Sequence, residues 1–276
     1  MKKAVLCLLL TGAAFATEKK RIVSVGAIAS ELVCEIGACG DIVATDVTSV
    51  YPPELLKKPK VGYVTRLSAE GILALRPTHM VVIDGAGPAT VLDQLKQSGV
   101  KIVKVPVGIG LGDAAKRLEI LGEFAGNAPA AKKLSQKMRA DVAQLSHQKK
   151  SKRPPKVLFI YARGAQTLLA MGANTTAHEL IELAGAANAF DAEGAKPVNA
   201  EAIAASQADI VLIPEGSLAG LGGAEALQKI PGFAQTPAGK KRRLVTLEDS
   251  LLAGMGPRTA AAARTLRNKI AEAMQK

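Results

Sequence analysis

The chain has 276 residues, and 36 lysines and arginines against 24 aspartates and glutamates give a formal net charge of +12. Aromatic residues make up only 3% of the chain and its basic runs are scattered. The stacking platform and continuous basic face of a nucleic-acid-binding protein are therefore not expected. The length allows one large domain or two ordinary ones.

Residues 1–16 have the three parts of a secretory signal peptide: two lysines, an apolar run and a small-residue cleavage pattern. The apolar run is too short to anchor the protein across a bilayer. Cys7 lies inside this run, well before the expected cleavage point, so a lipid-modified cysteine is not expected. Loss of the two signal lysines would lower the net charge to +10. We therefore expect an exported protein that does not span the membrane.

Strand and helix patterns alternate along the rest of the chain. The first half predicts strands at residues 21–25, 42–45, 79–83 and 101–105, with helices at residues 31–36, 68–76 and 89–98. A long helical stretch follows at residues 113–148, with a break where Pro129 suits the first turn of a second helix. The second half predicts strands at residues 157–161, 209–213 and 244–247, and helices at residues 175–183, 199–206 and 258–274. Such alternation predicts parallel strands joined by right-handed crossovers.

The predicted fold class is α/β, with two Rossmann-like lobes that contain mainly parallel sheets and are joined by a long helical linker. The predicted boundaries are a signal peptide at residues 1–16, an N-terminal lobe at 17–112, a linking helical segment at 113–153 and a C-terminal lobe at 154–276. Because ligands collect at the carboxyl ends of parallel strands, we expect a ligand cleft between the lobes.

Two short helices echo each other, one in each half of the chain. Ser68 can cap the first helix and Glu70 follows in its first turn, while Asn199 and Glu201 take the same places in the second. Both glutamates either simply favour a helix N-terminus or form a matched pair of acidic docking points, one per lobe.

Cys34 and Cys39 lie five residues apart across a predicted helix end. A bridge is conceivable in an oxidising compartment, but helix geometry does not favour it. We expect two small, mostly buried thiols instead. Without nearby histidine or aspartate ligands, the pair would make a weak metal site.

Five motifs make the chain resemble the class III periplasmic substrate-binding proteins of ABC importers, most closely the haem-binding members. They occur in the expected order and cover nearly all of the chain after the signal segment. They are Arg-Ile-Val-Ser-Val-Gly at 21–26, Val-Gly-Tyr at 61–63 with Leu-Ser-Ala-Glu-Gly-Ile-Leu at 67–73, Leu-Ala-Gly-Ala-Ala-Asn-Ala at 183–189, Lys-Pro-Val-Asn-Ala-Glu-Ala at 196–202, and Gly-Met-Gly-Pro-Arg-Thr at 254–259.

The resemblance implies a monomeric periplasmic protein that binds haem b as its transported ligand. It also implies delivery of that haem to an inner-membrane ABC permease with its ATPase, with no chemistry on the porphyrin. The same scaffold could instead carry an iron-siderophore or cobalamin, and both alternatives remain open on the sequence.

The resemblance also assigns roles to four residues around the expected haem. It makes Tyr63 the haem-iron ligand, and a phenolate oxygen is a hard donor suited to ferric iron. Arg258, in the Gly-Pro-Arg motif, corresponds to a position that reaches the ligand from the other lobe. Arg66 and Lys60 are expected to meet the propionates. Relatives often carry an arginine two residues after the tyrosine, where this chain has Thr65.

Further residues follow from the same resemblance. Some relatives use a histidine of the second lobe as an additional ligand, which makes His178 a candidate second haem ligand, although an exposed helical histidine is the commoner case. Tyr161 is expected to line the cleft as a haem contact. Glu70 and Glu201 would dock on arginines of the permease, where rim charges fix register and association rate.

Other classes fit the sequence less well. Three dispersed histidines make a poor zinc site. An exported Rossmann-type enzyme could be argued from the Gly-Ala-Gly string at residues 85–87, but the final glycine is missing, Pro88 interrupts the turn and no acidic partner follows. No Ser-His-Asp set or paired carboxylates emerge. The sequence therefore predicts a carrier and not an enzyme.

Overall fold

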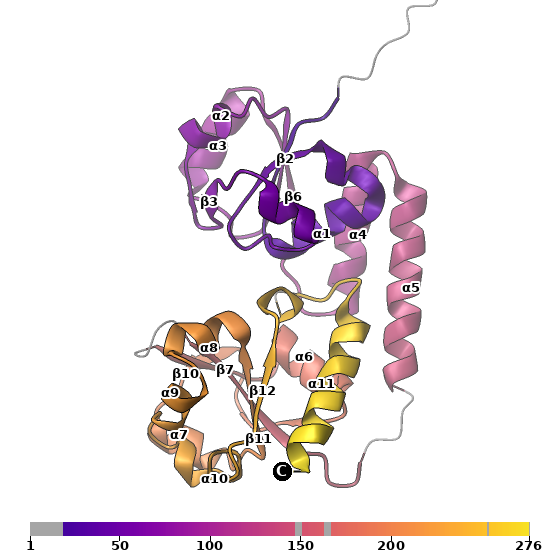
Figure 1. Cartoon of the computed structure of the whole chain (residues 1–276). Helices are drawn as coiled ribbons and strands as arrows, with labels where there is room; N and C mark the ends of the chain where they lie inside the picture. The colour runs from indigo at the N-terminus through magenta and orange to yellow at the C-terminus, as the bar shows by residue number, and fades with distance from the viewer. Residues whose placement is uncertain (1–18, 147–150, 163–166, 253, 276) are drawn as a thin grey trace, which may run out of the picture.

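The computed structural model describes residues 19–146, 151–162, 167–252 and 254–275. They form two α/β lobes, one above the other in Figure 1, with long helices along one side. The predicted signal peptide at residues 1–16 lies outside the described residues. Within the described ranges, no helix has both the length and the hydropathy needed to cross a bilayer.

The N-terminal lobe is built on a sheet of four parallel strands in the order β2-β1-β5-β6. Its inner strands are buried apolar segments, because helices cover both faces. The strands are β1 (Ile22–Val25), β2 (Ile42–Thr45), β5 (His79–Ile83) and β6 (Lys101–Val105). One face carries α1 (Ala27–Val33) and α4 (Leu111–Ala125), and the other carries α2 (Ala69–Leu73) and α3 (Ala89–Gln97).

The C-terminal lobe has a larger, mixed sheet in the order β10-β8-β7-β11-β12, with β9 also paired to β7. The strands β7, β11, β12 and β9 run parallel to one another, whereas β8 pairs antiparallel with both β7 and β10. The sequence did not predict β8, β9 or β10. The strands are β7 (Lys156–Ala162), β8 (Leu168–Met171), β9 (Ala187–Asn188), β10 (Ala195–Pro197), β11 (Ile210–Pro214) and β12 (Leu244–Leu247).

Helices again cover both faces of this sheet, so each lobe is a three-layer structure. On one face lie α6 (Thr176–Leu183) and α11 (Thr259–Met274). On the other lie α7 (Ala200–Ala205), α8 (Glu215–Leu221), α9 (Ala224–Gln228) and α10 (Pro237–Lys240). Single 3-10 turns are η2 (Cys39–Asp41), η3 (Pro53–Lys57), η4 (Phe233–Gln235) and η5 (Asp249–Leu252).

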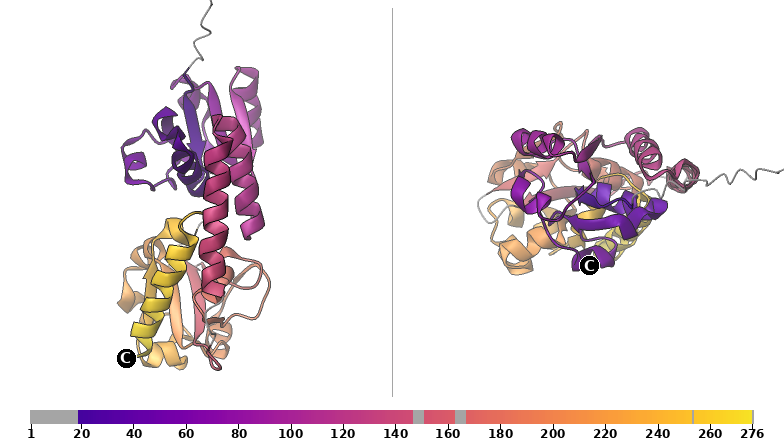
Figure 2. Two further views of the ribbon diagram at one scale, coloured as in Figure 1. Left: turned by 90° about the vertical axis from the view of Figure 1, so that its right-hand side faces the viewer. Right: turned by 90° about the horizontal axis from the view of Figure 1, so that it is seen from above.

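The helix α5 (Ala128–Ser146) joins the lobes and runs beside both of them in Figure 2. It begins after a break at Asn127, with Pro129 in its first turn as the sequence predicts. Ala131 and Met138 of α5 are buried in the core of the N-terminal lobe, and its last turns bury Val142 and Leu145 in the core of the C-terminal lobe. One rigid helix therefore contributes to both cores.

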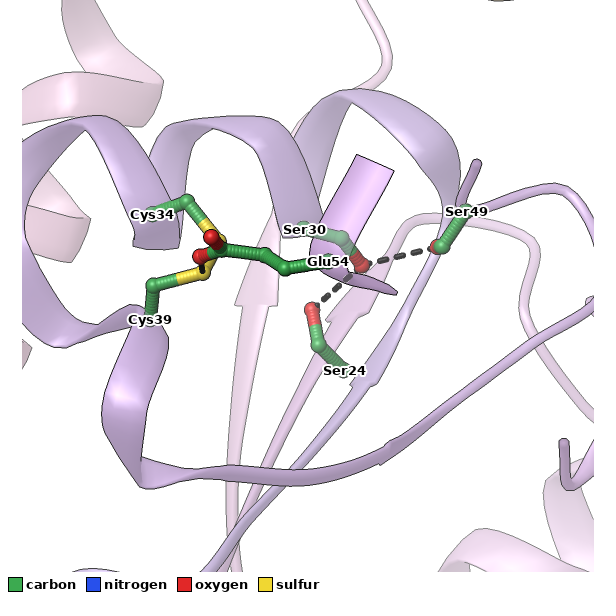
Figure 3. Close-up of a disulfide and its surroundings, with 6 residues drawn as sticks. All are labelled: Ser24, Ser30, Cys34, Cys39, Ser49 and Glu54. Carbon is green, nitrogen blue, oxygen red and sulfur yellow. Dashed lines mark hydrogen bonds between the residues drawn. A yellow bond between two sulfur atoms is a disulfide. The ribbon is translucent and has the colours of Figure 1, made fainter. Parts of the chain in front are cut away.

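The expectation of two unbridged thiols was wrong, because Cys34 and Cys39 form a disulfide (Figure 3). The predicted helix of residues 31–36 begins earlier, at Ala27, and does not continue as an α-helix to the second cysteine. It changes to a π-helical turn, η1 (Cys34–Ala38), in which Gly37 takes a positive φ of 90°. A π-helical turn is wider than an α-helical one and brings residue i+5 back toward residue i, so the two Cα atoms lie 4.0 Å apart. The carboxylate of Glu54 lies beside the bridge (Figure 3).

Candidate functional site

A cleft of about 610 Å³ lies between the lobes. Its walls come from both lobes, mostly from residues at or just after the carboxyl ends of strands, as predicted for a doubly wound sheet. The N-terminal wall consists of Ala27, Val47, Thr48, Val50, Tyr63 and Ile109. The C-terminal wall consists of Phe159, Tyr161, Met171, Asn174, Thr175, Thr176, Ala177, Pro214, Asp249, Ser250 and Leu252.

The N-terminal wall is held by Asp46, a fully buried carboxylate directly after β2. It accepts hydrogen bonds from the Gly26 backbone N–H at 2.8 Å, the Thr48 N–H at 2.9 Å and the Ser49 hydroxyl at 2.6 Å. Ser49 in turn contacts the hydroxyl of Ser30 on α1 at 2.8 Å (Figure 3). These bonds satisfy the buried charge and fix the loop that presents three lining residues.

Tyr63 enters the cleft from a two-stranded hairpin, β3 (Gly62–Tyr63) and β4 (Arg66–Leu67), where the sequence predicted a loop. Gly62 has a φ of +105°, and a Cβ there would lie 2.7 Å from the Arg66 carbonyl oxygen. Glycine is therefore required immediately before the tyrosine. The Gly62 carbonyl accepts from the Val47 N–H at 3.0 Å, which ties the hairpin to the cleft wall. The Tyr63 side chain is 41% exposed, available to a ligand.

The C-terminal wall is also fixed by backbone hydrogen bonds. Tyr161 lies near the end of β7, and Met171 ends β8. The carboxylate of Asp249 accepts from the Gly216 N–H at 2.8 Å. Thr175 caps α6 by accepting from the His178 N–H at 3.2 Å. The wall is therefore preorganised, and its side chains are mostly apolar or neutral.

The sequence predicts Arg66, Lys60 and Arg258 at the ligand, but none of the three is among the described residues that line the cleft. Among the described lining residues, Asp249 alone carries a formal charge. Arg66 is exposed beside Tyr63 in the register of the hairpin, outside that lining. A ligand with carboxylates would therefore find a cation, Arg66, beside the cleft and a mostly apolar lining whose one described charge, Asp249, is negative.

Lys60 points toward its own loop. Its ammonium donates to the Thr45 hydroxyl at 2.8 Å and to the carbonyls of Ser49 at 2.9 Å and Leu55 at 3.2 Å. Burial lowers the pKa of Lys60, and the charge of Asp46 acts in the opposite direction. In this arrangement Lys60 stabilises the loop that carries part of the cleft wall.

Arg258 is not among the described residues that line the cleft. It belongs to a group of side chains that joins the lobes. Its Nη2 donates to Glu31 Oε2 on α1 at 2.7 Å and to the Ser250 hydroxyl at 2.9 Å. Its Nη1 lies 3.7 Å from Glu248 Oε2, and its guanidinium stacks 3.6 Å from the ring centroid of Tyr51. We call these five residues the lobe-bridging cluster.

The two charges of this pair are buried to different degrees. The side chain of Glu31 is 4% exposed and that of Arg258 is 18% exposed. Burial raises the pKa of Glu31, although the hydrogen bond and charge of Arg258 act to lower it. Burial would lower the pKa of Arg258, but its hydrogen bond and attraction to Glu31 raise it on balance. Burial therefore decides the direction of the pKa shift for Glu31, whereas the interaction with Glu31 decides it for Arg258.

His178 is not among the described residues that line the cleft, although the three residues before it are. Its Nδ1 is 3.3 Å from the side-chain amide nitrogen of Asn188, and the ring is half-buried.

Glu70 and Glu201 are exposed in the first turns of α2 and α7, whose caps Ser68 and Asn199 accept backbone hydrogen bonds. Both helices lie on the left-hand side of Figure 1.

Sequence reasoning missed Asp46, Glu31 and most of the apolar lining residues. A signal existed for Asp46, because an acid followed by threonine and serine directly after a strand is typical of a side chain that caps a loop. For Glu31, the signal was a lone acid in an otherwise apolar segment of α1. Nothing in the sequence identified its partner, which lies 227 residues away.

Comparisons with known proteins agree on the class of this chain. The family described as "Periplasmic binding protein" matches residues 22–251. The structure is similar to the periplasmic heme-binding protein RhuT from Roseiflexus sp. RS-1 in apo form, with a TM-score of 0.87 and 34% identity, over 93% of this chain and 100% of that one. It is also similar to the periplasmic heme-binding protein BhuT in complex with two hemes, with a TM-score of 0.84 and 32% identity, over 92% and 99% of the two chains.

Sequence relatives are more distant. The uncharacterized ABC transporter substrate-binding lipoprotein YvrC of Bacillus subtilis is 26% identical over 246 residues, which cover 87% of this chain and 76% of that protein. The vitamin B12-binding protein of Photorhabdus laumondii is 25% identical over 249 residues, which cover 89% and 86%.

Proposed function

The chain belongs to the periplasmic binding protein family, and from this premise we propose that it binds haem in the interlobe cleft and delivers it to the permease of an ABC importer. The family and the similar structures are binding proteins and not enzymes. The protein is accordingly a carrier that acts outside the cytoplasm. Export to the periplasm through a signal peptide at residues 1–16 is part of the proposal.

The observation that carries the proposal is the phenol of Tyr63 at a largely apolar cleft of about 610 Å³. A flat, apolar macrocycle gains from burial between such walls. A phenolate oxygen is a suitable ligand for the ferric iron at its centre, as in other tyrosine-ligated haems. We propose haem b as the ligand and Tyr63 as its axial ligand.

The other polar groups have supporting roles in this proposal. Arg66 is exposed next to Tyr63, so it can meet a propionate at the rim. Tyr161 faces the ligand from the second lobe, as wall or as a hydrogen-bonding contact. Glu70 and Glu201 are the proposed docking points for the permease, one on each lobe, and the helices that carry them, α2 and α7, lie on the same side in Figure 1.

An absorption titration with ferric haem tests the proposal. The native protein should bind saturably and give high-spin tyrosinate bands. Tyr63→Phe keeps the ring but removes the oxygen, so those bands should disappear, whereas Tyr161→Phe should retain them. If Tyr63→Phe keeps the native spectrum, then Tyr63 is not the ligand. If no haem binds to the native protein, the function itself is wrong.

Cobalamin is the second candidate, because vitamin B12-binding proteins are among the sequence relatives. The same titration with cyanocobalamin separates the two. A carrier of haem should show no saturable binding of cobalamin, and tight binding of cobalamin alone would replace haem in the proposal.

A further inference from the structure

The lobes meet along a seam between α1 and the loop at residues 254–258, which leads into α11. Met255, from the C-terminal lobe, is 2% exposed and packs in the core of the N-terminal lobe. Its carbonyl accepts from Nη2 of the buried Arg117 on α4 at 2.6 Å. A Cβ on Gly256 would lie 2.6 Å from Ile28 Cδ1 on α1. The loop is thus closely fitted to the opposite lobe.

The lobe-bridging cluster extends this seam toward the cleft. Ser250, which accepts from Arg258, lines the cleft itself. Ala27 also lines the cleft and lies about one turn before Glu31 on α1. The cluster therefore sits behind the cleft wall and connects a lining segment of each lobe.

Both terminal nitrogens and one face of the Arg258 guanidinium have partners within the lobe-bridging cluster. Glu31, Ser250 and Glu248 take its terminal nitrogens, and Tyr51 covers one face. Its buried Nε has no hydrogen-bond partner among the described residues, but it is closed off from solvent. These contacts hold the guanidinium at the seam, and Arg258 is not among the described residues that line the cleft.

We propose that Arg258 is a positioning residue that fixes the spacing of the two lobes, and thereby the time that a ligand stays in the cleft, without touching the ligand. Its guanidinium holds α1 of one lobe and the residue 248–250 segment of the other at fixed separation. Loss of this connection lets the walls separate, so a bound ligand leaves faster. The part that concerns haem rests on the proposed function, whereas the part that concerns lobe spacing does not.

The lobe spacing can be measured without ligand. Spin labels on cysteines placed at exposed Gln97 on α3 and exposed Lys229 after α9 report the distance between lobes by pulsed electron spin resonance. The native pair Cys34–Cys39 is oxidised and does not react. The distance distribution should be narrow in the native background and broad in Arg258→Gln. Arg264→Gln, which removes an exposed arginine from the same helix, should leave it unchanged.

The ligand measurement uses the same variants. Transfer of haem to an excess of apomyoglobin should be about tenfold faster from Arg258→Gln, within the usual range for coupling between sites. The absorption spectrum of the bound haem should stay native, because the iron ligand is unchanged. Arg258→Lys keeps the charge but not the planar fork, so it should restore the rate only in part.

Several results would overturn the proposal. A native distance distribution in Arg258→Gln would show that the residue does not set the spacing. An altered haem spectrum would show that it touches the ligand. If Arg258→Gln does not fold, Glu31→Gln removes the charge from the other side, and an unchanged distance distribution in that variant refutes the proposal. Absence of haem binding in every variant, with the distances behaving as expected, would refute only the proposed function.

Discussion

Replacing Arg258 by alanine would leave the carboxylate of Glu31 buried between the lobes without its partner. The nitrogen and oxygen of this pair are 2.7 Å apart. At that separation the attraction between unit charges is about 6 kcal/mol for an effective dielectric constant of about 20. Desolvation of the two ions costs several kcal/mol each, so the intact pair contributes little net stability.

Removal of one partner has a different result. Arg258 donates to Oε2 of Glu31, and the other oxygen, Oε1, has no hydrogen-bond partner among the described groups. Without Arg258 the carboxylate would therefore lose the donor that these contacts give it. We expect Arg258→Ala to lower the free energy of unfolding by about 3–5 kcal/mol near neutral pH. Glu31→Gln, which buries a neutral amide instead, should cost only about 1 kcal/mol.

The loss should depend on pH in a defined direction. Burial raises the pKa of Glu31 above its usual value of 4.5, so the folded state holds more protons than the unfolded state just above that pH. This group therefore makes stability fall as the pH rises through that range. Without Arg258 the pKa of Glu31 rises further, so the pH range over which stability falls extends to higher pH. The deficit of Arg258→Ala should thus be largest at neutral to alkaline pH and shrink toward pH 4.5.

Urea unfolding followed by circular dichroism at about pH 5 and about pH 8 measures these differences. Arg264→Ala is the matched control, because it removes an exposed arginine from α11. Equal losses for Arg258→Ala and Glu31→Gln, or a loss that does not change with pH, would refute the account of a stranded carboxylate.

Three other outcomes are expected. Reduction of the Cys34–Cys39 bridge should cost about 2 kcal/mol in urea unfolding, because it closes a loop of only a few residues; a larger loss would mean that the bridge maintains the π-helical turn itself. Burial lowers the pKa of His79, with Lys20 and Lys101 adding to the effect, so stability should fall as the pH drops below about 6.5, and His79→Gln should flatten that decline. Charge reversal of Glu70 together with Glu201 should abolish stimulation of the permease ATPase without changing haem binding, while reversal of exposed Glu123 on α4 should change neither.

The fold was largely predictable because its strands are buried on both faces and read as short apolar runs between helices. The prediction was less successful where structure depends on distant or irregular contacts. The hairpin that carries Tyr63 is too short to give a pattern, and β8 and β10 are short strands at one side of the sheet, with β10 at its edge. The disulfide depends on a change from α to π geometry, with Gly37 at positive φ, that propensity does not reveal.

The candidate site was predictable only in part for the same reason. Motif resemblance identified Tyr63, and the structure places it in the cleft lining. It also identified Arg258 but not its surroundings, since Glu31 and Tyr51 come from the other lobe. Lys60 was expected at the ligand, but its ammonium donates to one oxygen at the end of β2 and to two carbonyls of the loop that follows. A sequence motif thus locates a side chain in the chain without specifying its direction.

The insertion of Met255 into the N-terminal core has a consequence for dividing this protein. A gene fragment that ends at the lobe boundary would encode an N-terminal half lacking a side chain that is 2% exposed in the whole protein. That half would also lack the last turns of α5 in their packed environment. The two halves are therefore not interchangeable cassettes, and chimaeras with relatives should be joined so that residues 254–258 and α1 come from the same parent.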